Sequence, residues 1–153
     1  MSSIALQNRS RSEPTLGPLL QRVLDADSRG RQLVSSPSLP GVVRELADTA
    51  ERLGYGALLG ASPIGHNLVG AMTLASPSLR PWTPGQDTRV LVVDAIVAGI
   101  SGLLIAGSRA HALGVRNVEA LVVDAPANLD PGSSPDSPIQ RLITLGLQHR
   151  LAA

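Results

Sequence analysis

Apolar residues recur at helical spacing in four parts of the chain. Between Thr15 and Asp27, leucines and valines stand three or four positions apart, and the same spacing returns between Leu39 and Leu53. Residues three or four apart share one face of a helix, so each stretch predicts an amphipathic helix. Pro40 suits the first turn of the second helix, and Gly54 suits its C-terminal cap. We therefore predict helices over 15–27, 39–53, the stretch through 68–74, and 102–113.

Continuous aliphatic runs alternate with these helices. The clearest is Arg89–Asp94, and two others are Ala57–Gly60 and Val118–Asp124. Such runs are typical of buried parallel strands, and their alternation with helices predicts right-handed βαβ units. A shorter run at 31–34 could add a strand, and a last apolar segment spans 139–147. The predicted fold class is α/β, with a Rossmann-like parallel sheet flanked by helices.

Composition bounds the size and the surroundings of this fold. The chain has 153 residues, of which 43% are hydrophobic, with no Phe, one Trp and one Tyr. This suits a single aliphatic core. The first dozen residues are polar and rich in Ser and Arg, so we expect a disordered tail over 1–13 and a single domain over 14–150. Neither a membrane-spanning run of ~20 apolar residues nor a signal-like segment occurs, and cysteine is absent. We expect a cytoplasmic protein without membrane partners.

The charge pattern excludes some chemistry. The net charge is +1, which gives no general attraction to nucleic acid. All 13 basic residues are arginine, so a lysine Schiff base, a lysine phosphate clamp and a lysine general acid are impossible. The sequence assigns no catalytic residue.

The most informative segment runs from the Arg89–Asp94 strand into the small-residue turn 98–102. In open α/β sheets, ligands bind at the carboxyl ends of strands. Backbone N–H groups at a helix N-terminus suit a phosphate, and Asp94 beside them could accept hydrogen bonds from sugar hydroxyls or approach a phosphate-bound Mg²⁺. An ordinary strand-to-helix connection with a capping serine explains the same residues.

Two segments resemble the type I phosphoribosyltransferase family. Residues 84–94 look like the approach to the motif that binds phosphoribosyl pyrophosphate (PRPP) in that family, where a hydrophobic strand leads through acidic residues into a loop. Residues 55–71 are similar to the orotate-using branch, in which a strand runs into a pyrophosphate-binding loop. The resemblance covers roughly residues 16–145, with the segments in the same order and at similar spacing.

This resemblance implies a fold, a ligand and a set of contacts. The fold is that of type I phosphoribosyltransferases, with a reduced hood and without the long flexible-loop hairpin. Mg²⁺ is implied as a cofactor when PRPP is bound, close to Asp94 directly or through water. The implied ribose-phosphate contacts are Asp94, Ala98, Gly99, Ile100, Ser101 and Gly102, and the implied pyrophosphate contacts are Ala61, Ser62, Pro63, Ile64 and Gly65.

The chain departs from the family pattern at four places. Ala95 replaces a second acid, and the loop 98–102 lacks the usual threonines, so Ser101 is the remaining hydroxyl. Residues 76–85 are too few for the mobile hairpin, and they carry neither lysine nor histidine. Ala125 follows Asp124 where the orotate branch has an arginine, so orotate is not the expected substrate.

These departures leave two hypotheses for the function. In the first, the protein binds PRPP or a nucleoside 5′-monophosphate and, if active, transfers phosphoribose to a nitrogenous base. In the second, it is a non-catalytic regulatory or scaffolding relative, partnered with an active homologue. The expected partners are a small nucleotide or PRPP and a second subunit, in a homodimer or in a heterodimer with a homologue.

Overall fold

The computed structural model contains one parallel β-sheet. It describes the backbone of residues 2–146, and the side chains of residues 17–146 apart from residue 133. All strand pairs are parallel, and the strand order across the sheet is β2-β1-β3-β4-β5. This confirms the predicted α/β class. The strands are β1 (Ala57–Gly60), β2 (Arg80–Pro81), β3 (Arg89–Ile96), β4 (Asn117–Asp124) and β5 (Leu142–Thr144).

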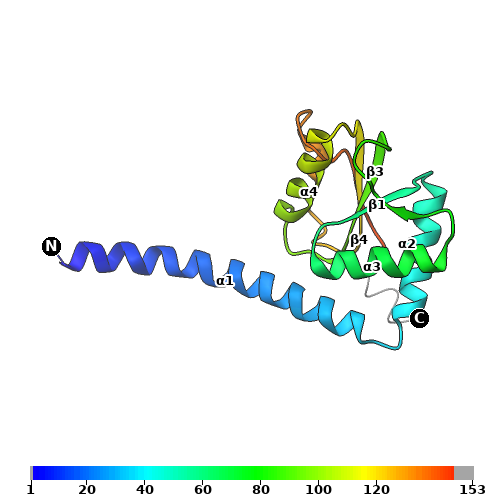
Figure 1. Cartoon of the computed structure of the whole chain (residues 1–153). Helices are drawn as coiled ribbons and strands as arrows, with labels where there is room; N and C mark the ends of the chain where they lie inside the picture. Colours follow the sequence, from blue (N-terminus) through cyan, green and yellow to red (C-terminus); the bar gives the residue numbers. More distant parts are fainter. Residues whose placement is uncertain (1, 147–153) are drawn as a thin grey trace.

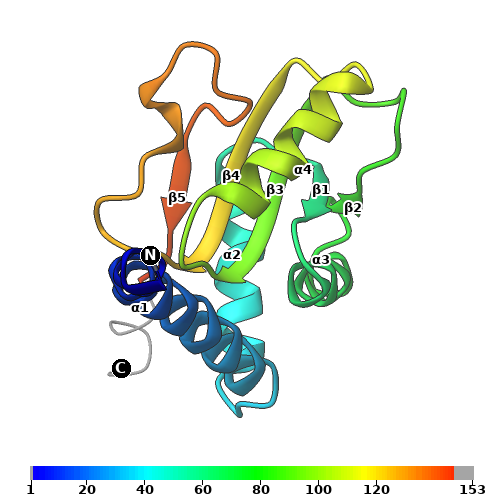
Figure 2. The ribbon, with the colours of Figure 1, turned by 90° about the vertical axis from the view of Figure 1, so that its left-hand side faces the viewer.

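Helices cover both faces of the sheet. α2 (Leu39–Arg52) and α3 (Pro63–Ala75) pack on one face, and α4 (Ser101–Ala112) packs on the other (Figure 2). The predicted caps of α2 are confirmed, because Pro40 lies in its first turn and Gly54, with φ of +79°, follows its end. The left-handed conformation costs glycine little, so Gly54 can end the helix there.

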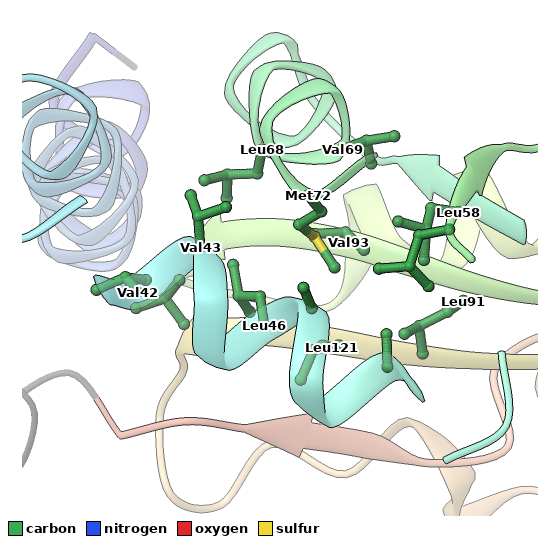
Figure 3. Close-up of a cluster of buried hydrophobic side chains, with 14 of the residues drawn as sticks. Val42, Val43, Leu46, Leu58, Leu68, Val69, Met72, Leu91, Val93 and Leu121 are labelled. Atoms are coloured by element: carbon green, nitrogen blue, oxygen red, sulfur yellow. The ribbon is translucent and has the colours of Figure 1, made fainter. Parts of the chain in front are cut away.

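The main core lies between the sheet and the pair α2 and α3. Leu46 and Met72 from the helices and Leu121 from β4 each have 0% of their surface exposed (Figure 3). A second cluster fills the opposite face, where Leu103 of α4 packs over Val90 and Val122. Aliphatic side chains on both faces of β3 and β4 explain their continuous apolar runs.

The first helix, α1 (Ser2–Val34), differs from the sequence-based expectation at both ends. Residues 2–13 are helical, although their polar composition predicted a disordered tail, and residues 31–34 continue the helix, so the predicted short strand was wrong. Leu33 explains the second difference, because it is buried in the main core as a helical side chain. Sequence spacing alone could not separate a four-residue strand from the last turn of a helix.

Most of α1 reaches beyond the sheet (Figure 1). Its C-terminal part passes the carboxyl ends of the strands, toward which β5 also points (Figure 2). No described helix is both long enough and apolar enough to cross a membrane.

The Pro-rich connection and the C-terminal segment are more regular than the sequence suggested. The two-residue strand β2 lies within 76–88, and Trp82 N–H donates to the Leu58 carbonyl oxygen at 2.7 Å. The last apolar segment forms β5 at 142–144, and its remainder from Leu147 lies outside the described residues.

A polar cluster ties four chain segments together beside the core. The Tyr55 hydroxyl donates to Glu119 Oε1 at 2.5 Å, Arg141 pairs with Glu119, and the Arg89 guanidinium lies 4.4 Å from the centre of the Tyr55 ring. Burial, followed by the hydrogen bond to Glu119, raises the pKa of Tyr55. Burial also raises the pKa of Glu119, but the hydrogen bonds from Tyr55 and Arg141 and the two nearby guanidinium charges outweigh it, so this pKa lies below its usual value.

This cluster should give stability a defined acid dependence. A carboxyl whose pKa is lower in the folded state stabilises the fold fully above its unfolded pKa, and this contribution is lost as the pH falls through the folded pKa. We expect the wild-type free energy of unfolding to fall below about pH 4.5, the ordinary value for Glu, and Glu119→Gln to lack this part of the decrease. Urea unfolding at a series of pH values measures the free energy of unfolding of the wild type and of Glu119→Gln. An equally steep acid decrease in Glu119→Gln would contradict the assignment. Arg141→Gln should make the decrease smaller, because loss of the guanidinium raises the folded-state pKa of Glu119 towards its unfolded value.

Candidate functional site

The strand order reverses between β1 and β3, and this reversal creates a crevice. The chain leaves β1 into α3 on one face of the sheet and leaves β3 into α4 on the other face. Ligands of open α/β sheets bind at such a point, outside the carboxyl ends of the strands. Here the two loops that flank it are the two predicted from sequence, 61–65 and 98–102.

One hydroxyl joins the loop after β1 to strand β3. Ser62 is the N-cap of α3, and its Oγ accepts a hydrogen bond from Gly65 N–H at 3.0 Å. The same Oγ donates to Asp94 Oδ1 at 2.6 Å, and Ala95 N–H also donates to Oδ1 at 2.9 Å. Because both bonds to Asp94 fall on Oδ1, Oδ2 is the oxygen left for a ligand or a metal-bound water.

Two glycines allow the start of α3 to lie directly against the sheet. A Cβ on Gly60 would lie 2.5 Å from His66 N, and a Cβ on Gly65 would lie 2.5 Å from the Val93 carbonyl oxygen. Real Cβ atoms do not approach backbone atoms so closely. Gly65 therefore has a packing role, and it sets the short distance between Ser62 and Asp94.

The loop after β3 is more open than the loop after β1. Ile100 is the N-cap of α4, and no side chain caps this helix. The first N–H groups of a helix have no partner within it and carry a partial positive charge. A Cβ on Gly99 or on Gly102 would meet nothing within 4 Å, so the space above this backbone is free for a ligand.

Helix α1 passes the crevice and borders two cavities. The β1–β3 cavity, of about 720 Å³, is lined by Leu19 and Val23 of α1 and by residues of both loops, Ser62, Asp94, Gly99 and Ser101 among them. The β4 cavity, of about 640 Å³, lies on the other side of α1 and is lined by Arg22, Asp25, Arg29, Asp124, Ala125 and Pro126. Both volumes are in the range of small-molecule sites.

Ion pairs fix the charges around the cavities. Arg29 Nη2 lies 2.7 Å from Asp124 Oδ2, which ties α1 to the end of β4. Arg31 pairs with Asp27 on the same helix at 3.0 Å. The β1–β3 cavity then has one guanidinium, from Arg31, against the two carboxylates of Asp27 and Asp94, a formal net charge of −1.

Comparison with known proteins identifies no relative of this chain. No family model, no curated protein and no solved structure matches the chain. The interpretation of the site therefore depends on its own geometry and on the sequence motifs.

The structure brings most of the predicted residues together. Ala61 and Ile100 do not line the β1–β3 cavity, because they pack in the cluster under α4, and Gly65 is buried against the sheet. The predicted residues that do line it are Ser62, Pro63, Ile64, Asp94, Ala98, Gly99, Ser101 and Gly102.

The position of Ala95 explains one departure from the family pattern. Ala95 is 1% exposed, and its Cβ lies 3.8 Å from the position of a Cβ on Gly30 of α1. A carboxylate at position 95 would be buried against α1 without a partner, which is unfavourable. Helix α1 therefore occupies the space that a second acid would need.

A metal ion would bind at this site only together with a phosphate-bearing small molecule. Within the described residues, no group of three or more His, Cys, Asp or Glu side chains could hold a metal ion. Mg²⁺ is commonly held by one or two carboxylates together with substrate phosphates and water. Asp94 fits that limited role, through Oδ2.

Sequence reasoning missed the contribution of α1. Leu19, Val23 and Arg29 line the cavities, although only the apolar spacing of α1 was evident in the sequence. The exposure of four of its apolar side chains, which a helix packed on a core would bury, is visible only in the structure: Leu19 53%, Leu20 58%, Val23 49% and Leu24 52%.

Proposed function

We propose that the chain is a divergent relative of the type I phosphoribosyltransferases that binds a ribose 5-phosphate group, in PRPP or in a nucleoside 5′-monophosphate. One observation carries this proposal: the Ser62–Asp94 hydrogen bond joins the loop after β1 to the carboxyl-terminal part of β3, at the wall of one cavity. Binding sites of this size with a few convergent polar groups are the common form of small-molecule sites.

Each polar group has a role in this proposal. Asp94 Oδ2 accepts hydrogen bonds from the ribose hydroxyls, while Ser62 holds the carboxylate in position through Oδ1. The uncapped N–H groups at the start of α4 and the Ser101 hydroxyl bind the phosphate. Mg²⁺, when present, would neutralise phosphate charge next to Asp94. The β4 cavity is close enough to receive a second group of the ligand, because both cavities share Ala26, Ile96 and Val97.

Ligand binding without autonomous transfer is the better-supported form of this function. Transfer from PRPP requires stabilisation of a leaving pyrophosphate and exclusion of water. Lysine is absent, and two of the three arginines that line the cavities are ion-paired with aspartates. A regulatory subunit is the second candidate, and the exposed Leu20 and Leu24 of α1 favour it because a partner chain could cover them.

Titration calorimetry with ribose 5-phosphate tests the site. We expect wild-type protein to bind this ligand and Asp94→Asn to weaken binding at least tenfold, because the amide replaces a charged acceptor. Asp48→Asn, at an exposed position of α2, should leave the affinity unchanged. No binding of ribose 5-phosphate, PRPP or a nucleoside 5′-monophosphate at millimolar concentration would contradict the proposal and favour the regulatory subunit.

Two glycine variants provide a matched test of the phosphate position. Gly102→Ala and Gly70→Ala each add a methyl group in a helix where nothing lies within 4 Å, but only Gly102 lines the cavity. Both variants should fold normally. Gly102→Ala alone should weaken ribose 5-phosphate binding several-fold, because its methyl group projects from the backbone that the phosphate approaches.

A further inference from the structure

The loop predicted to bind pyrophosphate has little capacity left for an anion. Ala61 N–H donates to the Val93 carbonyl oxygen at 3.0 Å, and Gly65 N–H donates to Ser62 Oγ at 3.0 Å. Pro63 has no N–H, so three of the five backbone donors expected in this loop are unavailable. The Ser62 hydroxyl hydrogen is also used, by Asp94.

The charge around the same cavity opposes a ligand with many negative charges. Among the described residues that line it, the single guanidinium, from Arg31, is paired with Asp27 at 3.0 Å, and Asp94 adds a second carboxylate. PRPP carries a pyrophosphate in addition to its 5-phosphate. A cavity whose charged side chains sum to a formal net charge of −1 attracts such a ligand less than a positively charged one would. One phosphate can be held by the N-terminus of α4, but the described residues that line the β1–β3 cavity offer no unpaired cation for the pyrophosphate, and Arg22 lines only the neighbouring β4 cavity.

The outer wall of the cavity is apolar. Leu19 and Val23 of α1 line it and are 53% and 49% exposed, so each keeps about half of its surface for a further contact. Covering this surface with a flat apolar group is favourable because it removes apolar area from water. A ribose phosphate alone does not offer such a group, whereas a nucleobase does.

From these three observations we infer that the ligand of the β1–β3 cavity is a nucleoside 5′-monophosphate and not PRPP. The single phosphate binds at the start of α4, the ribose hydroxyls bind Asp94, and one face of the base packs on Leu19 and Val23. This inference depends on the proposed function, and it names the substrate class of the same site.

Calorimetry with four probes tests the inference: AMP, UMP, ribose 5-phosphate and PRPP, each with and without Mg²⁺. We expect AMP or UMP to bind at least tenfold more tightly than ribose 5-phosphate and PRPP, because the base adds an apolar contact. Tighter binding of PRPP than of both nucleotides in Mg²⁺ would overturn the inference.

Two neighbouring leucines provide the matched variants. Leu19 and Leu20 are equally exposed on α1, but only Leu19 lines the cavity. We expect Leu19→Gln to lose most of the tenfold gain of the nucleotides and to keep ribose 5-phosphate affinity, while Leu20→Gln changes neither. Equal nucleotide affinities in Leu19→Gln and Leu20→Gln would overturn the assignment of Leu19 to the wall that the base contacts.

The outcomes separate this inference from the proposed function. In one outcome, ribose 5-phosphate binds and Asp94→Asn weakens its binding, but AMP and UMP bind no more tightly than ribose 5-phosphate. This result leaves the proposed function standing and overturns the inference. Absence of binding by all four probes overturns both.

Discussion

Replacement of Gly65 by alanine is expected to lower the free energy of unfolding by about 3 kcal/mol or more. The new Cβ would lie 2.5 Å from the Val93 carbonyl oxygen and 3.3 Å from Asp94 Oδ1, so α3 must move away from the end of β3. Overpacking commonly costs ~1–3 kcal/mol, and a clash with backbone, which cannot rotate away, belongs at the upper end. Urea denaturation followed by circular dichroism measures the change.

Gly70→Ala is the control for this substitution. Gly70 lies on the same helix, is exposed, and would place its Cβ in open space, so alanine there should be neutral or stabilising by about 0.5–1 kcal/mol. If Gly65→Ala and Gly70→Ala had the same stability, the close contact between α3 and β3 would be disproved.

Truncation of Leu46 to alanine should cost about 2–5 kcal/mol. Leu46 on α2 has none of its surface exposed and packs in the cluster with Leu121 and Met72 (Figure 3). Removing three carbon atoms there leaves a cavity that rigid strands on one side and α3 on the other can fill only in part. The midpoint of urea unfolding should fall accordingly, with little change in the slope.

Leu74→Ala is the control, because it makes the same substitution at an exposed position. Leu74 lies near the end of α3 and is 90% exposed, so its truncation should change the free energy of unfolding by less than about 0.5 kcal/mol. Similar losses in Leu46→Ala and Leu74→Ala would mean that α2 does not pack on the sheet as described.

The first of these predictions bears on the function. The resemblance to phosphoribosyltransferases implied that Gly65 binds pyrophosphate, and the structure gives it a packing role. Ser62 likewise caps α3 and orients Asp94. The loop after β1 therefore acts mainly as a support for Asp94, and the proposed ligand contacts lie in the open loop after β3.

The sequence by itself determined the elements of this protein and the two loops of the candidate site. Aliphatic runs predicted β1, β3 and β4, and helical spacing predicted α2 and α4 within a few residues of their bounds. These signals are local: a period of 3.6 or a continuous apolar run depends on which face of a short segment is buried. The hydrogen bond between Ser62 and Asp94 was not predicted, because it requires β1 and β3 to lie side by side in the sheet.

Only the tertiary structure decided how α1 contributes and which polar groups remain free. Spacing in 15–27 predicted a helix but not its place beside the crevice, because the burial of Leu33 and the ion pair between Arg29 and Asp124 join residues far apart in the chain. Whether a backbone N–H is free likewise depends on its neighbours in space: Ala61 is engaged by Val93, whereas the start of α4 has no cap. Contacts between distant segments leave no periodic mark on the sequence, and these contacts set the charge, the apolar wall and the donors of the site.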